Sequence, residues 1–242
     1  SSFAAVPTPR GILSRPLSGD VRFVRDAIVV CVAALAFFAS AAFSQTFDPK
    51  LVPADLSAAD GFGRAIALRA DLLVVGAPFA DVQGANSGAV YVFERSGGTW
   101  SQTAKLVEPS GSMGARFGSA VAVTATRIVV GAPGGQNASG LATGVVHVFE
   151  SVGGLWAPTI ALEANDGAAG DEFGAAVAAE LDRVAVGAPL ADGIPFVQHP
   201  GAVYVFDRSF GVWQQSGKVV ETLHGQDFDG FGTAIDIADD RI

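Results

Sequence analysis

The residues of this sequence whose type and spacing could form a chemically functional site are acidic. They gather just before a recurring Phe-Gly pair, at Asp60, Asp166, Asp171, Glu172, Asp227 and Asp229. Clustered carboxylates could hold Ca²⁺, which takes about six to eight oxygen ligands. Asp in turns more commonly accepts hydrogen bonds from nearby backbone N–H groups, and we expect that role here. A weak calcium site in the loop that contains Asp166 and Asp171 is the alternative.

The sequence contains no recognisable catalytic or cofactor-binding motif. It has no Gly-x-Ser-x-Gly turn, no pair of cysteines, no His-x-x-x-His and no Gly-rich phosphate loop. His147 replaces a Tyr in a repeated strand, and we interpret it as a packed strand residue because catalysis needs convergent partners. His199 and His224 lie in loops without a repeated acidic or thiol partner. We therefore expect no enzyme activity, no catalytic residue, no cofactor and no metal ligand set.

The most regular positions in the chain are structural. Phe-Gly recurs at residues 62–63, 117–118, 173–174 and 231–232, and Gly-Ala-Pro follows at residues 76–78, 131–133 and 187–189. Each Gly-Ala-Pro is followed by an aromatic strand and then by a tryptophan, at Trp100, Trp156 and Trp213. A nearly constant internal period indicates a repeat architecture. Tryptophans in phase with it indicate packing, with carbohydrate stacking as the alternative.

Each repeat predicts four short strands. In the first repeat, apolar residues 65–68 and 72–75 form two strands, and Gly-Ala-Pro at 76–78 ends the second because proline cannot donate to a ladder. Residues 88–93 and 100–107 form the third and fourth strands. Four antiparallel strands in roughly 50 residues, repeated, are typical of propeller blades.

These motifs resemble FG-GAP repeats, which build the seven-bladed propeller at the head of integrin α subunits and occur in many bacterial secreted proteins. The resemblance covers residues 47–242, and the Gly-Gly-x-Trp turns at 97–100 and 153–156 are similar to the bacterial type. It implies an all-β propeller of four-stranded antiparallel blades, incomplete in this chain. We expect blades over residues 62–242 as three repeats and the start of a fourth, with further blades beyond them. Residues 45–61 are expected to give an outermost strand and a lead-in to the first repeat.

One departure from the family pattern concerns calcium. Many members carry an Asp-x-Asp-x-Asp-Gly loop in the turn between Phe-Gly and Gly-Ala-Pro. The corresponding turns here, at residues 69–71, 125–127, 181–183 and 238–240, hold too few carboxylates for a calcium cage. Because of this departure, we do not carry the calcium role of the family over to these turns.

Residues 1–44 predict an N-terminal extension and a signal peptide. Arg22 and Arg25 precede an apolar run at 27–38, and small residues follow it. We expect cleavage between Ala41 and Gln45, and a secreted or cell-surface protein. A retained membrane anchor is the alternative, because residues 27–43 approach the ~20 residues that span a bilayer. The only cysteine, Cys31, belongs to this segment, so the repeats hold no disulfide.

The loop after each Gly-Ala-Pro varies while the frame around it stays constant. Rigid elements with variable loops are typical of a binding scaffold. By resemblance, these loops share one face with the loops before Phe-Gly, the face that integrins use for ligands. We expect a non-enzymatic extracellular or cell-surface binding or adhesion module for an unidentified protein or glycan. The candidate contact residues are Asp81, Gln83, Asn86, Gln136, Asn137, Asp192, Phe196 and His199.

Other functional classes are less consistent with the sequence. Acidic residues outnumber basic ones by 24 to 15 and no Lys/Arg cluster occurs in the repeats, which excludes a nucleic-acid partner. An accessory propeller of a larger, phospholipase-like secreted hydrolase, with its catalytic part outside this chain, is the first alternative. A structural spacer in a surface array is the second. Contact with a membrane is expected only through an uncleaved N-terminal segment.

Overall fold

The structure is a computed structural model that describes residues 50–192, 199–221 and 229–238. The predicted signal peptide at residues 1–44, with Cys31 and the expected cleavage site, lies outside this part. The described residues form twelve strands, and none of them belongs to a helix capable of crossing a bilayer.

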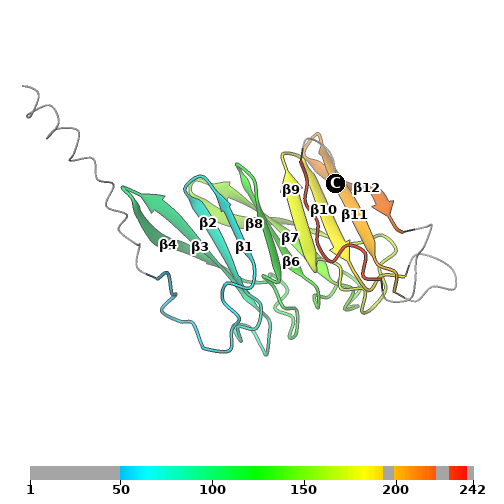
Figure 1. Cartoon of the computed structure of the whole chain (residues 1–242), viewed down its shortest axis with the longest axis horizontal. Helices are drawn as coiled ribbons and strands as arrows, with labels where there is room; N and C mark the ends of the chain where they lie inside the picture. Colours follow the sequence, from blue (N-terminus) through cyan, green and yellow to red (C-terminus); the bar gives the residue numbers. More distant parts are fainter. Residues whose placement is uncertain (1–49, 193–198, 222–228, 239–242) are drawn as a thin grey trace, which may run out of the picture. The chain divides into compact units, whose positions relative to one another are not determined.

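The strands form three sheets of four, each antiparallel and each in chain order (Figure 1). The first sheet contains β1 (Ile66–Arg69), β2 (Leu72–Ala77), β3 (Ala89–Ser96) and β4 (Thr99–Leu106). The second contains β5 (Ala120–Val123), β6 (Arg127–Ala132), β7 (Val145–Val152) and β8 (Leu155–Leu162). The third contains β9 (Ala176–Glu180), β10 (Arg183–Ala188), β11 (Ala202–Ser209) and β12 (Val212–Val219). The predicted all-β fold with four-stranded antiparallel blades is confirmed.

The strand limits differ in detail from the sequence-based ones. β2 continues through Gly76 and Ala77, so Pro78 alone ends it. Residues 50–61, where an outermost strand was expected, form turns and loop instead. A strand needs a partner for its backbone groups, and no strand among the described residues lies beside this segment.

The hydrophobic core is divided between the spaces that separate neighbouring sheets. Val90 and Val92 of the first sheet pack with Phe117, Ile128 and Phe149 of the second repeat. A second cluster joins the second and third sheets in the same way. Each blade therefore buries its apolar side chains against the next blade, as in other repeat proteins.

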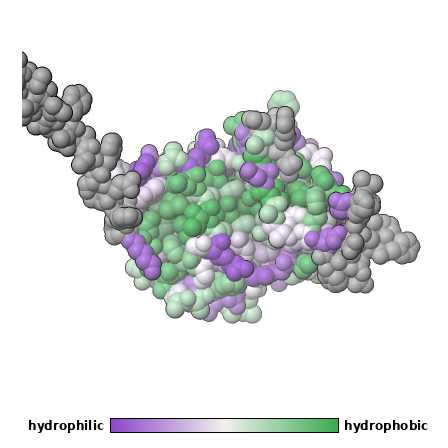
Figure 2. All heavy atoms as spheres, viewed as in Figure 1, coloured by the Kyte–Doolittle hydropathy of each residue, from purple (hydrophilic) through white to green (hydrophobic). Residues whose placement is uncertain are grey.

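Apolar side chains also remain at the surface. Figure 2 shows a band of them across one face, with hydrophilic side chains below the band and around its rim. On β1, Ile66 and Leu68 are 61% and 64% exposed. The equivalent strands of the other two sheets, β5 and β9, instead have apolar side chains packed against the core clusters.

In the first three repeats, the Phe of the Phe-Gly pair packs against the aromatic strand of its own repeat, edge-on in every case to the Phe of that strand. The ring centroids of Phe62 and Tyr91 lie 5.6 Å apart, and those of Phe173 and Tyr204 lie 5.4 Å apart. In the second repeat the partner is His147, at 5.8 Å from Phe117. Edge-to-face contacts of this kind add stability beyond the area they bury.

The three tryptophans occupy the same cross-strand register. The pairs are Arg95–Trp100, Ser151–Trp156 and Arg208–Trp213. All three rings pack against the core clusters. This repeated placement agrees with the structural role predicted for them.

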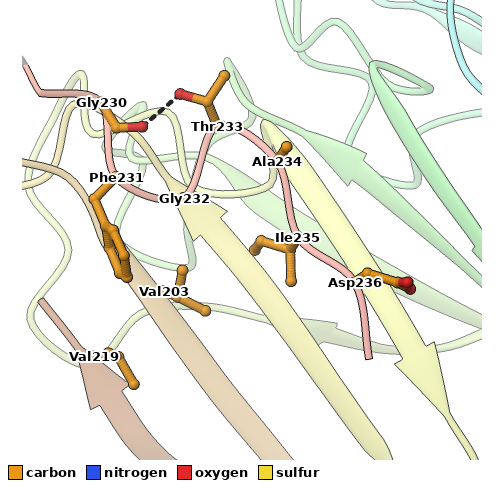
Figure 3. Close-up of a pocket in the computed structure, with 9 residues that line it drawn as sticks. All are labelled: Val203, Val219, Gly230, Phe231, Gly232, Thr233, Ala234, Ile235 and Asp236. Carbon is orange, nitrogen blue, oxygen red and sulfur yellow. Dashed lines mark hydrogen bonds between the residues drawn. The ribbon is translucent and has the colours of Figure 1, made fainter. Parts of the chain in front are cut away.

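The fourth repeat begins beside the third sheet. Phe231 forms a parallel bridge with Gly201, as Phe117 does with Gly88. A hollow of about 450 Å³ lies between this segment, Val203 and Val219 (Figure 3). The equivalent space between the first two sheets is filled by Ile128 and Phe149, so we interpret the hollow as packing space between blades.

Candidate functional site

The variable loops leave the sheets at equivalent points, just after β2, β6 and β10. Each is fastened to the lead-in of the next repeat by backbone hydrogen bonds. The N–H of Phe117 donates to Ser87 at 3.1 Å, and the N–H of Phe173 donates to Thr143 at 3.0 Å. The loops after Gly-Ala-Pro and those before Phe-Gly therefore lie side by side. We call the surface formed by residues 79–88, 108–117, 134–144 and 164–173 the loop face.

Four of the predicted contact residues hold their own loops. Asp81 Oδ1 accepts a hydrogen bond from the N–H of Asn86 at 2.7 Å. In the third repeat, Asp192 Oδ1 accepts one from the N–H of His199 at 2.9 Å. Asn86 and His199 both have a positive φ, of 51° and 50°. These carboxylates fix the left-handed residues that turn the chain back toward the third strand of each blade. Phe196 lies outside the described residues.

The second loop is held differently. Asn137 Oδ1 accepts hydrogen bonds from the N–H groups of Ser139 and Leu141, both at 3.0 Å. Gln136 occupies the position of Asp81 and Asp192 and is exposed. Within the described residues, the side chains of Gln83 and Gln136 make no hydrogen bond. The exposed side chain of Asn86 is likewise without a hydrogen bond in the described residues, so these three predicted contact residues are the ones that local structure leaves available.

Exposed apolar side chains on the loop face were missed by the sequence reasoning. Val82 is 39% exposed, Met113 73% and Leu141 50%. A Cβ placed on Gly84 would meet Met113 Cγ at 2.5 Å, so Met113 lies over the loop of the preceding repeat. In the sequence, these side chains could have been recognised as isolated apolar residues within otherwise polar, Gly-rich loops. Together the three side chains give the loop face an apolar component.

Two of the acidic residues before Phe-Gly, Asp60 and Asp171, cap turns. Buried Asp60 accepts a hydrogen bond from the N–H of Ser57 at 2.9 Å, and buried Asp171 accepts one from the N–H of Ala168 at 2.8 Å. Burial raises the pKa of Asp171 despite that hydrogen bond. Within the part of the chain that the structure describes, no three His, Cys, Asp or Glu side chains converge on a point. The capping role expected for these residues is the one that Asp60 and Asp171 perform.

Asp166 belongs to a different arrangement, which the first and third blades share. Its Oδ2 lies 2.8 Å from Lys218 Nζ, and that ammonium lies 5.0 Å from the centroid of the Tyr204 ring. Burial raises the pKa of Tyr204 to about 12. In the first blade, Lys105 pairs with Asp55 at 2.5 Å and lies over the Tyr91 ring at 5.2 Å. In both blades, a lysine on the fourth strand therefore pairs with an aspartate and lies over the tyrosine ring of the third strand.

Comparison with known proteins agrees with this geometry. A family model described as FG-GAP repeat matches residues 46–93, 100–149 and 156–206. The second and third matches begin in the fourth strand of one sheet, and every match ends in the third strand of a sheet, so the repeat of the family model is offset from the blade by one strand. A search of curated proteins found no match to the chain.

Proposed function

The chain belongs to the FG-GAP repeat family, and from that premise we propose that it is a non-enzymatic binding module outside the cell or at its surface. Its ligand is an extracellular protein or glycan, held by the loop face in an adhesive role. The single observation that supports this most is the constant frame beneath variable loops. Propeller-like modules of this family are often involved in binding.

The arrangement of the loop face favours recognition. Backbone hydrogen bonds between successive repeats fix each loop, so little conformational freedom is lost when a ligand binds. Exposed Val82 and Met113 supply apolar contact area, and Gln83 and Gln136 supply polar groups. A mixed apolar and polar surface of this kind is typical of non-obligate interfaces.

A glycan and matrix-protein binding array tests the proposal. We expect the full chain to bind a specific set of probes and the double variant Val82→Ser/Met113→Ser to lose most of that signal. The matched control is Val152→Ser/Leu155→Ser, which changes side chains that are 67% and 76% exposed on the β7–β8 hairpin. Equal loss in both variants, or no specific binding by the unchanged chain, would refute the proposal.

A further inference from the structure

The second blade has no lysine at the position that Lys105 occupies in the first blade and Lys218 in the third. The three cross-strand pairs at this position are Tyr91–Lys105, His147–Ala161 and Tyr204–Lys218. The acidic partner is also changed, since Ser110 stands where the other blades have Asp55 and Asp166. Ala161 has neither the methylene chain nor the ammonium group that a lysine at this position would place beside His147.

The space that the lysine stem fills in the other blades is open in the second. A hollow of about 470 Å³ lies beside His147, with Ala161 in its wall. Val145 and Ile160 add apolar surface that suits methylene groups. Gln136 and Asn137 border the hollow on the side of the loop face.

The hollow also retains a negative charge, which Glu108 supplies. Glu108 is 1% exposed and accepts hydrogen bonds from Ser110 Oγ at 2.6 Å and from the N–H of Ser112 at 2.9 Å. Burial raises the pKa of this carboxyl, but the nearby His147 imidazole and the hydrogen bonds outweigh burial and lower it to about 2. Glu108 is therefore ionised at neutral pH.

His147 has unused hydrogen-bonding capacity beside this charge. Its side chain is 7% exposed, and Nε2 lies 3.3 Å from Glu108 Oε1. The two atoms do not meet hydrogen-bond geometry, and Nε2 has no other hydrogen-bond partner among the described residues. The hydroxyls of Tyr91 and Tyr204 at the same register position also have no hydrogen-bond partner among the described residues, so what distinguishes the second blade is the missing lysine.

We propose that this hollow binds a primary alkylammonium group. Its methylenes replace the lysine stem found in the first and third blades, and its ammonium is held by the Glu108 carboxylate, beside the His147 ring. The sister blades show the same chemistry satisfied internally, by Lys105 and Lys218. The amine belongs either to a lysine side chain of a partner protein or to a free diamine. The hollow borders the loop face and shares Gln136 with it, but the apolar contacts proposed above, Val82 and Met113, lie outside the hollow.

Nuclear magnetic resonance titration of the full chain tests the site directly. The probes are Nα-acetyl-lysine methylamide, 1,5-diaminopentane and the neutral Nα-acetyl-norleucine methylamide. We expect saturable shifts at His147 and Ala161 with an amine and none with the norleucine compound. Tighter binding of the lysine compound indicates a partner's side chain, and tighter binding of the diamine indicates a free ligand. Absence of saturable shifts with both amines, or equal shifts with norleucine, overturns the proposal.

Two variants, with one control variant, test whether the amine binds in this hollow. Ala161→Lys restores the residue of the sister blades and is expected to abolish amine binding by filling the hollow. Ala157→Lys, which adds the same charge at an exposed position of β8 outside the hollow, is the control and should bind as the unchanged chain does. Glu108→Gln is expected to weaken binding by about tenfold or more, because a charge-assisted contact is lost.

The variants also separate this site from the proposed function. If Glu108→Gln fails to fold, Ala161→Lys decides, and undiminished amine binding by that variant overturns the proposal. A chain that binds amines but no array probe keeps this site and refutes only the loop-face role. The reverse result refutes only this site.

Discussion

The carbonyl oxygen of Gly118 lies where a side chain on Gly76 would begin. A Cβ on Gly76 would be 2.0 Å from that oxygen, and Gly131 and Gly187 have the same relationship to Gly174 and Gly232. The Phe-Gly backbone of one blade thus rests on the Gly-Ala-Pro backbone of the blade before it. Within a repeat, the N–H of Gly63 also donates to the carbonyl of Gly76 at 3.0 Å. The two halves of the motif recur together because they are in contact.

Gly76→Ala should therefore separate the first two blades. We expect a loss of about 3 kcal/mol in the free energy of unfolding, because the obstacle is backbone rather than a movable side chain. Urea denaturation measures it. Gly217→Ala is the control, since its Cβ would meet only Val205 atoms at 3.8 Å or more and no positive φ is involved. Equal stability of the two variants would contradict this role of Gly76.

Arg127 joins the second and third blades. Its Nε lies 2.8 Å from Glu150, and Nη1 donates to the carbonyl of Leu181 at 2.8 Å. Its guanidinium carbon lies 5.6 Å from the centroid of the Trp213 ring. Arg127 is 8% exposed, so its removal leaves a gap beside Trp213 and takes one of two arginine partners from the half-buried Glu150.

We expect Arg127→Met to cost about 2–4 kcal/mol of unfolding free energy, and Arg127→Lys to recover little because lysine lacks the planar fork. The control is Arg95→Met, which removes an exposed pair with Asp71 inside a single sheet and should cost less than about 1 kcal/mol. Chemical denaturation of the three variants provides the comparison. Similar losses of unfolding free energy in Arg95→Met and Arg127→Met would show that the contact of Arg127 between blades adds no more stability than an exposed ion pair.

Glu108 makes the stability of the chain sensitive to acid. Its pKa is about 2 in the folded state, below the ordinary value of 4.5. The stabilisation is therefore present above about pH 5 and is lost as the pH falls toward 2. A shift of this size corresponds to about 3 kcal/mol.

The unfolding free energy of Glu108→Gln should consequently vary less between pH 5 and pH 3 than that of the unchanged chain. Urea midpoints at pH 7, 5 and 3 measure the difference. Glu94→Gln, on the exposed part of β3, is the control and should follow the unchanged chain. Parallel curves for all three proteins would exclude Glu108 as the source of acid sensitivity.

Asp81 should control the order of its loop rather than global stability. Asp81→Ala removes the acceptor of the Asn86 N–H, so we expect faster hydrogen exchange at that amide. The unfolding free energy should change by less than about 1 kcal/mol because the side chain is exposed. Gln83→Ala, which removes no hydrogen bond seen in the described residues, should leave the exchange rate unchanged. Equal exchange in both variants would show that Asp81 does not clamp the loop.

The sequence alone determined the repeat and the four-stranded blade. Phe-Gly and Gly-Ala-Pro recur in phase, and strands in an antiparallel blade are short and local, so their pattern is legible along the chain. It also placed the variable loops after Gly-Ala-Pro and the capping role of Asp60 and Asp171.

Only the tertiary structure decided what the remaining side chains do. Asp81 and Asp192 were predicted from the sequence as ligand contacts, and that prediction stays open; the structure adds that each holds the loop in which it lies. His147 looked like a simple replacement for Tyr, because its relation to Ala161 depends on cross-strand register and its relation to Glu108 on the path between two blades. Contacts of this kind join residues far apart in sequence, and no local pattern records whether the space between them is filled.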